Sequence, residues 1–164
     1  MEDGVDVIVF SAVDYNANAE IIGQAAQRGI KIVVIDSDVN SSMVSCRIGT
    51  NNLQAGVKAA EAALAVGEDE LYIGIVNYDV NSANGQQREL GFRQTVEQDP
   101  RVKDITTINV LSTTEDARAG AKEMLLSDSR INVVVTFNEW TSLGVGWAIR
   151  DLDRGDSCLL YTSD

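Results

Sequence analysis

Short runs of branched apolar residues alternate with longer helical patterns along nearly the whole chain, and this alternation limits the fold more than any other feature. Runs with the length and β-branched content of strands lie at residues 5–10, 32–35, 71–76, 105–110 and 133–137, with a weaker one at 44–48. Helical patterns lie at residues 16–28, 53–66, 85–98, 116–126 and 140–151. Strict alternation favours mostly parallel sheets covered by helices on both faces. The sequence therefore predicts an α/β fold of doubly wound, Rossmann-like type.

Composition and charge argue against several functional classes. The chain has 164 residues, a formal net charge of −12 and no histidine. A nucleic-acid surface needs a basic patch and none is visible, so we expect no nucleic-acid binding through this segment. Without histidine there is no Ser-His-Asp or Cys-His arrangement, and the commonest metal ligand is missing. Cys46 and Cys158 lack metal-ligand spacing, so we expect neither a metal site nor a cofactor.

The pattern divides the chain at about residue 50, and both ends look truncated. The segment CRIGTNNLQAG leads from the weak strand into a helix and follows the longest stretch without helical periodicity. It predicts a crossing between two lobes, with an ordinary long loop as the alternative. At the far end, RGDSCLLYTSD does not continue the preceding helical period. The tail at 157–164 resembles translated cloning or adapter sequence, with a short native strand at CLLY as the alternative.

Polar side chains follow the predicted strands. In open parallel sheets, ligands bind at the carboxyl ends of the strands. The residues at those ends are mostly acids, amides and hydroxyls: Ser11, Asp14, Asp36, Asp38, Asn77, Asp79, Ser112, Thr113, Asn138 and Glu139. Arg88 adds a positive group near the start of the helix that follows Asn77. These residues predict a ligand-binding edge.

The string IVVIDSDV at residues 32–39 has two interpretations. Asp36 and Asp38 resemble the first motif of Mg²⁺-dependent aspartyl phosphatases, in which one Asp is the nucleophile and the other a proton donor. That chemistry also needs a Lys and a further acid at later strand ends, and no Lys occupies such a position. The phosphatase is therefore a remote alternative, and we expect no enzymatic activity.

The second interpretation is a binding site for a polyhydroxy ligand. Each sugar hydroxyl both donates and accepts a hydrogen bond. The carboxylate of Asp36 can accept from two neighbouring hydroxyls, the guanidinium of Arg88 donates in a planar fork, and the amide of Asn138 does one of each. Hydrogen bonds to charged groups contribute roughly 1.5–3 kcal/mol each. A purely structural role, capping a helix or ending a strand, is the alternative for Asp36 and Asn138.

Four segments in sequence resemble the type I periplasmic sugar-binding proteins, close to the ribose-binding branch, whose core is shared by lac-repressor-type regulators. The segments are VDVIVFSAVDYNANAEIIGQAAQRGIKIVVIDSDV, IGTNNLQAGVKAAEAAL, SANGQQRELGF and VVVTFNEWTSLGVGWAI, and the resemblance extends over residues 6–152. It implies the type I periplasmic-binding-protein fold, incomplete at both ends. Residues 1–50 would be part of the first lobe and residues 51–156 most of the second.

The resemblance also implies roles for particular residues. Asp36 would be the first-lobe acid that accepts from sugar hydroxyls, Arg88 the second-lobe guanidinium, and Asn138 an amide after a later strand. Further candidates for ligand contact are Ser37, Asn84 and Trp140. Two departures stand out: Ser37 replaces the Arg of the ribose-type pattern, and residues 112–114 replace an aromatic residue. Trp140 or Tyr78 could stack on a sugar ring, with packing as the alternative for both.

The implied function is a substrate-binding protein for ABC-type import. Its two lobes would close on a small sugar, with a monosaccharide favoured, without changing it chemically. A membrane permease would be its partner and its location periplasmic or extracellular, with or without a lipid anchor. The alternative is the ligand-sensing core of a lac-repressor-type regulator, which would carry a helix-turn-helix upstream.

Overall fold

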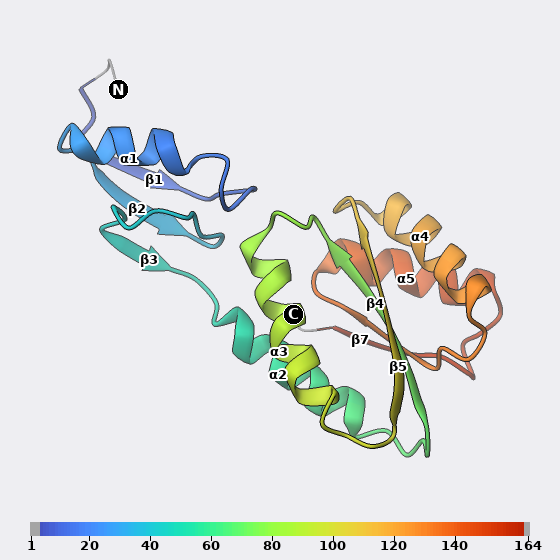
Figure 1. The fold of residues 1–164 in the computed structure, drawn as a ribbon. Helices are drawn as coiled ribbons and strands as arrows, with labels where there is room; N and C mark the ends of the chain where they lie inside the picture. The colour runs from blue at the N-terminus through green and yellow to red at the C-terminus, as the bar shows by residue number, and fades with distance from the viewer. Residues whose placement is uncertain (1–3, 163–164) are drawn as a thin grey trace. The chain divides into compact units, whose positions relative to one another are not determined.

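The chain forms two units in the computed structural model, which describes residues 4–162 (Figure 1). Unit 1 comprises Met1–Asn51 and Asn81–Gln86, and unit 2 comprises Asn52–Val80 and Gln87–Asp164. The short segment Asn81–Gln86 joins unit 1 partly through a backbone hydrogen bond from Tyr15 N to Asn81 O (3.0 Å). Among the described residues, no helix combines the length and the apolar character needed to cross a membrane.

Unit 1 contains a parallel sheet and one helix. Its strands are β1 (Val7–Phe10), β2 (Lys31–Ile35) and β3 (Cys46–Ile48), in the order β1-β2-β3, and the helix is α1 (Ala19–Gln27). α1 covers one face of the sheet, where its buried side chains pack against those of β2 (Figure 1). The core consists of Ala12, Ile22, Ala25, Ile30, Ile32, Val34 and Val39.

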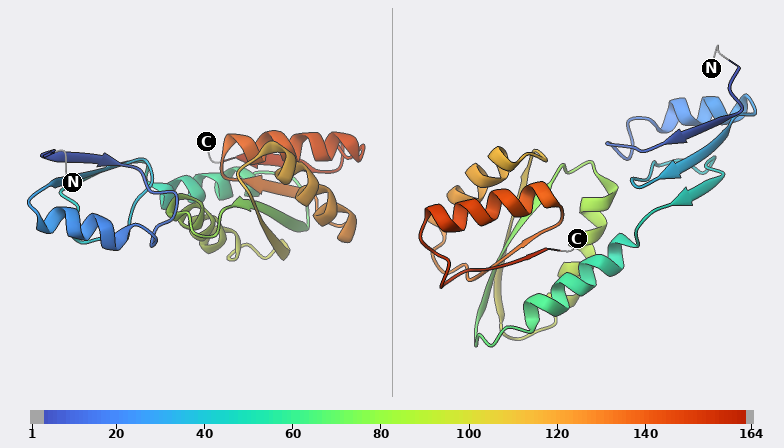
Figure 2. Two further views of the ribbon diagram at one scale, coloured as in Figure 1. Left: turned by 90° about the horizontal axis from the view of Figure 1, so that it is seen from above. Right: turned by 180° about the vertical axis from the view of Figure 1, so that it is seen from behind.

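Unit 2 contains a second parallel sheet with helices on both faces. Its strands are β4 (Leu71–Tyr78), β5 (Val102–Val110), β6 (Val133–Thr136) and β7 (Leu159–Thr162), in the order β5-β4-β6-β7. The helices are α2 (Asn52–Leu64), α3 (Ala83–Val96), α4 (Thr114–Ser127) and α5 (Glu139–Asp151), and α3 begins within the segment assigned to unit 1. α2 and α3 lie on one face of the sheet and α4 and α5 on the other (Figure 2). A separate apolar core fills each of the two interfaces.

The predicted α/β class with parallel, doubly wound sheets is confirmed, and every predicted strand and helix is present with shifted ends. The first helix starts at Ala19 rather than at residue 16 because Asp14 Oδ1 accepts from the backbone N–H groups of Asn16 and Ala17 (2.8 and 2.9 Å). Aspartate commonly forms such a turn, which competes with helix formation.

The tail forms the short strand that was the alternative interpretation of CLLY. β7 pairs in parallel with β6, with Leu159 opposite Val133, and the preceding Cys158 is buried in the core beneath α4 and α5. The foreign origin of residues 157–164 stays a prediction, and the last two of these residues lie outside the described range.

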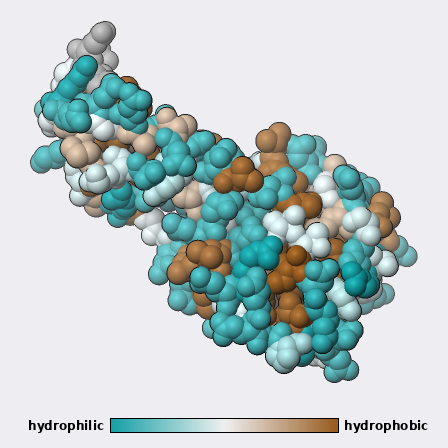
Figure 3. Space-filling view, viewed as in Figure 1, coloured by the Kyte–Doolittle hydropathy of each residue, from teal (hydrophilic) through white to brown (hydrophobic). Residues whose placement is uncertain are grey.

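Hydrophilic and hydrophobic residues are interspersed on the visible face of unit 2 (Figure 3). On the face shown in Figure 3, hydrophobic residues form separate patches with hydrophilic residues between them. This distribution agrees with the strongly acidic composition of the chain, because a net charge of −12 requires many carboxylates at the surface.

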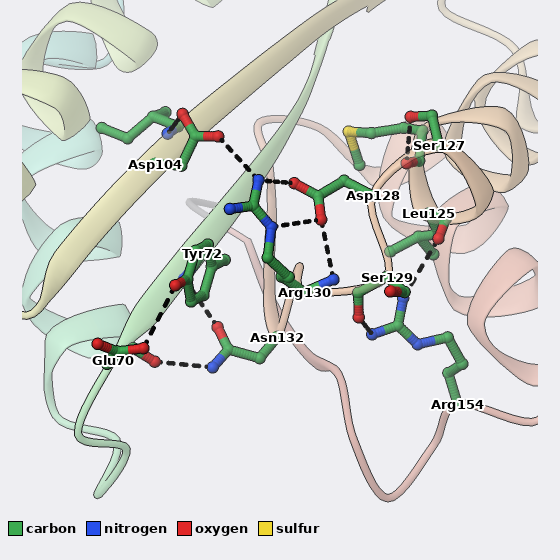
Figure 4. Close-up of polar contacts among 12 residues, drawn as sticks. Glu70, Tyr72, Asp104, Leu125, Ser127, Asp128, Ser129, Arg130, Asn132 and Arg154 are labelled. Carbon is green, nitrogen blue, oxygen red and sulfur yellow. Dashed lines mark hydrogen bonds and ion pairs between the residues drawn. The ribbon is translucent and has the colours of Figure 1, made fainter.

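A charged cluster joins the amino-terminal ends of the strands of unit 2 (Figure 4). Arg130 donates from Nε and Nη2 to the carboxylate of Asp128 (2.9 and 2.7 Å), and its guanidinium lies over the ring of Tyr72 in β4 (4.8 Å). The same Nη2 lies 3.6 Å from an oxygen of Asp104 in β5. Hydrogen bonds from Arg130 lower the pKa of Asp128 from 3.8 to about 2.

We expect Asp128→Asn to remove part of the acid sensitivity of unit 2. Because the folded-state pKa of Asp128 is depressed, its stabilising effect is present above the unfolded pKa and is lost as pH falls through about 2. The free energy of unfolding should therefore decline less steeply between pH 4 and pH 2 in the variant, as measured by urea unfolding. Glu61→Gln, at an exposed position of α2, is the matched control. Equal slopes for wild type and Asp128→Asn would contradict the assignment.

α2 and α3 touch through glycines. A Cβ added at Gly56 would collide with the carbonyl of Arg88, and one added at Gly91 would collide with the carbonyl of Leu53. Each helix thus presents a glycine to the backbone of the other, so the two backbones approach more closely than side chains would allow.

We expect Gly56→Ala to destabilise unit 2 by about 1–3 kcal/mol, because the new methyl group meets backbone that must shift. Gly23→Ala in α1 is the control, since a Cβ there meets nothing within 4 Å, and alanine is the better helix former. Urea unfolding measures both variants. Unchanged stability of Gly56→Ala would contradict the close crossing of α2 and α3.

Candidate functional site

Asp36 stands directly after β2 with its backbone in the left-handed region (φ 58°). This conformation is uncommon for a residue other than glycine and is often found at functional sites. The backbone N–H of Asp36 donates to Ile48 O (2.9 Å), and Gly49 lies so close that a Cβ there would be 2.9 Å from Asp36 O. The neighbouring β3 and its following glycine therefore hold Asp36 in a strained conformation, with its carboxylate exposed.

The predicted residues of unit 1 lie together. Asn84 Nδ2 donates to Ser37 Oγ (3.0 Å) and to Asp36 Oδ1 (3.3 Å), and Ser37 Oγ lies 3.4 Å from Asp36 Oδ2. Asn84 is only 8% exposed, whereas Asp36 is open to solvent. The result is an exposed carboxylate flanked by a hydroxyl and an amide, a combination that can both accept from and donate to ligand hydroxyls.

Asp38, the second acid of IVVIDSDV, makes different contacts. Its Oδ1 accepts from Arg47 Nε and from Val39 N, both at 2.8 Å, and Arg47 also donates to Ser41 O (2.6 Å). This side chain holds the loop that joins β2 and β3. Among residues 4–162, no three or more His, Cys, Asp or Glu side chains are grouped so as to hold a metal ion.

Asn52 and Phe137, both in unit 2, accept hydrogen bonds from Arg88 of α3. Its Nε donates to Asn52 Oδ1 at the start of α2 (2.8 Å), and its Nη1 donates to Phe137 O just after β6 (2.5 Å). Phe137 in turn packs edge-to-face against Phe92 of α3, with ring centroids 6.1 Å apart. The guanidinium therefore lies at the carboxyl end of β6, and its contact with a ligand stays a prediction.

Asn138 follows Phe137 and begins α5 as its N-cap. Its Oδ1 accepts from Thr141 N (2.9 Å) and Thr141 Oγ1 (2.8 Å), while its Nδ2 donates to Ser112 Oγ after β5 (2.8 Å). The capping role that was the alternative for Asn138 is thus present in the structure. Trp140, in the first turn of α5, is 51% exposed. Contact of either residue with a ligand stays a prediction.

Asn77, another strand-end amide, belongs to the interior. It has no exposed surface, and its Nδ2 donates to Glu89 Oε2 of α3 (2.7 Å). Glu89 Oε1 also accepts from Arg93 Nε (2.9 Å) and Thr107 Oγ1 (3.0 Å). This network fixes α3 against β4 and β5.

The sequence analysis missed Asn52. This buried residue, 4% exposed, contacts Arg88 across 36 positions of sequence. An asparagine before an apolar periodic run is normally read as a helix start, so the local pattern gave no sign of a second role.

The whole chain, residues 1–164, matches the sequence model of the periplasmic binding protein domain. It is 21% identical over 168 residues to the ABC transporter periplasmic-binding protein YphF of Escherichia coli (strain K12), an alignment that covers 98% of this chain and 51% of YphF.

Solved structures show the same fold. The periplasmic component of an ABC-type sugar transport system from Hahella chejuensis has a TM-score of 0.90 and 24% identity, covering 94% of this chain and 57% of that one. A solute binding protein from Agrobacterium vitis with bound D-fucose has a TM-score of 0.89 and 21% identity, covering 97% and 56%. One from Agrobacterium radiobacter in complex with D-arabinose has a TM-score of 0.88 and 23% identity, covering 94% and 54%.

The chain spans about half the length of these relatives. The match of the family model over residues 1–164, together with the paired α/β units, confirms the resemblance seen in the sequence. The chain belongs to the periplasmic binding protein domain family.

Proposed function

We propose that the protein is a substrate-binding protein that holds a small sugar for ABC-type import and performs no chemistry on it. The observation that carries the proposal is the arrangement around Asp36, where a strained strand-end acid presents its carboxylate beside Ser37 and Asn84. The relatives from A. vitis and A. radiobacter, which hold D-fucose and D-arabinose, support a monosaccharide as the ligand.

The residues of each unit suit the hydroxyl groups of a sugar. In unit 1 the carboxylate of Asp36 accepts, and in unit 2 the guanidinium of Arg88 donates. Because Asn52 and Phe137 already orient Arg88, little side-chain entropy is lost when it binds a ligand. The partner that we propose is a membrane permease, and the location is periplasmic or extracellular, with or without a lipid anchor.

Substitution of Arg88 by alanine should weaken sugar binding without removing the fold. One charge-assisted hydrogen bond is worth roughly 1.5–3 kcal/mol, so affinity should fall about 10- to 150-fold. Isothermal titration of the product of the complete reading frame with D-arabinose and D-fucose measures this change. Arg150→Ala, an exposed arginine in the last turn of α5, is the control and should bind as the wild type does. Equal affinity of Arg88→Ala and wild type would contradict the role of Arg88.

Substitution of Asp36 and of Asp38 by asparagine should distinguish a sugar-binding site from a phosphatase active site. Asn tolerates the left-handed backbone of position 36, so Asp36→Asn should lose about 10- to 100-fold in sugar affinity with little change in stability. Asp38→Asn should lose the ion pair with Arg47 but keep its sugar affinity within about twofold, since this acid serves the loop.

The same pair of variants tests the enzyme alternative. Mg²⁺-dependent release of phosphate from a sugar phosphate, abolished in both Asp36→Asn and Asp38→Asn, would replace the binding proposal. An unchanged sugar, recovered after incubation and identified by its proton NMR spectrum, is the expected result.

A further inference from the structure

We propose that Asn52 is a positioning residue that fixes the orientation of the Arg88 guanidinium for ligand binding. This inference rests on the proposed function and deepens it. Asn52 itself is buried, so its contribution is to act through Arg88 and not to touch the sugar.

Two acceptors together restrict the guanidinium. Asn52 Oδ1 accepts from Nε, and Phe137 O accepts from Nη1, so at least two of the three guanidinium nitrogens are bonded to fixed protein atoms. Two bonds to different nitrogens define both the plane and its rotation.

The close crossing of α2 and α3 makes the contact possible. Gly56 lies one helical turn after Asn52, and its Cα lies against the carbonyl of Arg88. Gly91, almost one turn after Arg88, lies against the carbonyl of Leu53. Because the backbones meet, the short side chain of asparagine reaches Nε at 2.8 Å.

The oxygen of Asn52 is the atom that matters for this role. Asn52 is the first residue of α2, and serine has a helix propensity close to that of asparagine, but its hydroxyl is shorter and does not reach Arg88 across the same gap. Aspartate has a similar helix propensity and keeps the oxygen at the same place. A role confined to starting α2 therefore predicts that serine and aspartate behave alike, whereas a positioning role predicts that only aspartate preserves function.

The test uses the product of the complete reading frame, with D-arabinose and D-fucose as the probes. Asn52→Ser should lower sugar affinity about tenfold, as expected for one hydrogen bond to a charged group, and Asn52→Asp should restore most of it. In an Arg88→Ala background, Asn52→Ser should cause no further loss, because the two residues act as one unit. Affinity lost equally in both backgrounds would overturn the proposal.

A second readout needs no sugar. The Nε–H of Arg88, followed by ¹⁵N NMR, should exchange slowly with water in the wild type and in Asn52→Asp, and at least about tenfold faster in Asn52→Ser. Unchanged exchange in Asn52→Ser would also overturn the proposal. If the wild type binds neither sugar while the exchange follows this pattern, the proposed sugar ligand is wrong, but Asn52 still positions Arg88.

Asn132→Ser is the matched control. Asn132 also lies in unit 2, where its Oδ1 accepts from Tyr72 N (3.0 Å) and its Nδ2 donates to Glu70 O (2.8 Å), at the opposite end of the strands from Phe137. Its substitution should lower the melting temperature and leave both sugar affinity and the Arg88 exchange rate unchanged. A loss of affinity in Asn132→Ser equal to that in Asn52→Ser would reduce the effect to general destabilisation and contradict the proposal.

Discussion

The close contact between α2 and α3 is the constraint on which the site in unit 2 depends. Gly56 and Gly91 remove the side chains that would separate the two helices, and each meets a carbonyl of the other helix. The contact places Asn52 against Arg88 and brings Arg88 to Phe137 at the end of β6. A dense interior transmits small displacements, so the position of this guanidinium depends on the two glycines.

In unit 1, the position of Asp36 is determined by the backbone and not by a helix crossing. β2 ends at Ile35, and the left-handed backbone of Asp36 turns the chain there, with Gly49 leaving room for the Asp36 carbonyl. The strain is stored next to Asn84 and Ser37, which contact the carboxylate. Both units thus carry polar groups at the carboxyl ends of parallel strands, the place where such folds bind ligands.

Hydrophobic periodicity was sufficient to predict the fold class and its elements because each βα unit repeats the same two periods. Periodicity did not predict the effects of two single polar residues. Asp14 delays the start of α1, and Asn52 accepts a hydrogen bond from Arg88 although its position indicates only a helix start. Position at a strand end predicted Asp36, Arg88 and Asn138 as candidate ligand-binding residues. It could not distinguish them from Asn77, another strand-end amide, which Glu89 holds in the interior. Long-range partners of this kind leave no local signal in a sequence.

The most direct test is a crystal structure of the complete gene product with the sugar that it binds most tightly. The account predicts an intact sugar whose hydroxyl groups lie within hydrogen-bond distance of the Asp36 carboxylate and the Arg88 guanidinium, with Asn52 still bonded to Nε. A sugar that contacts neither residue, or one that has been chemically changed, would contradict it.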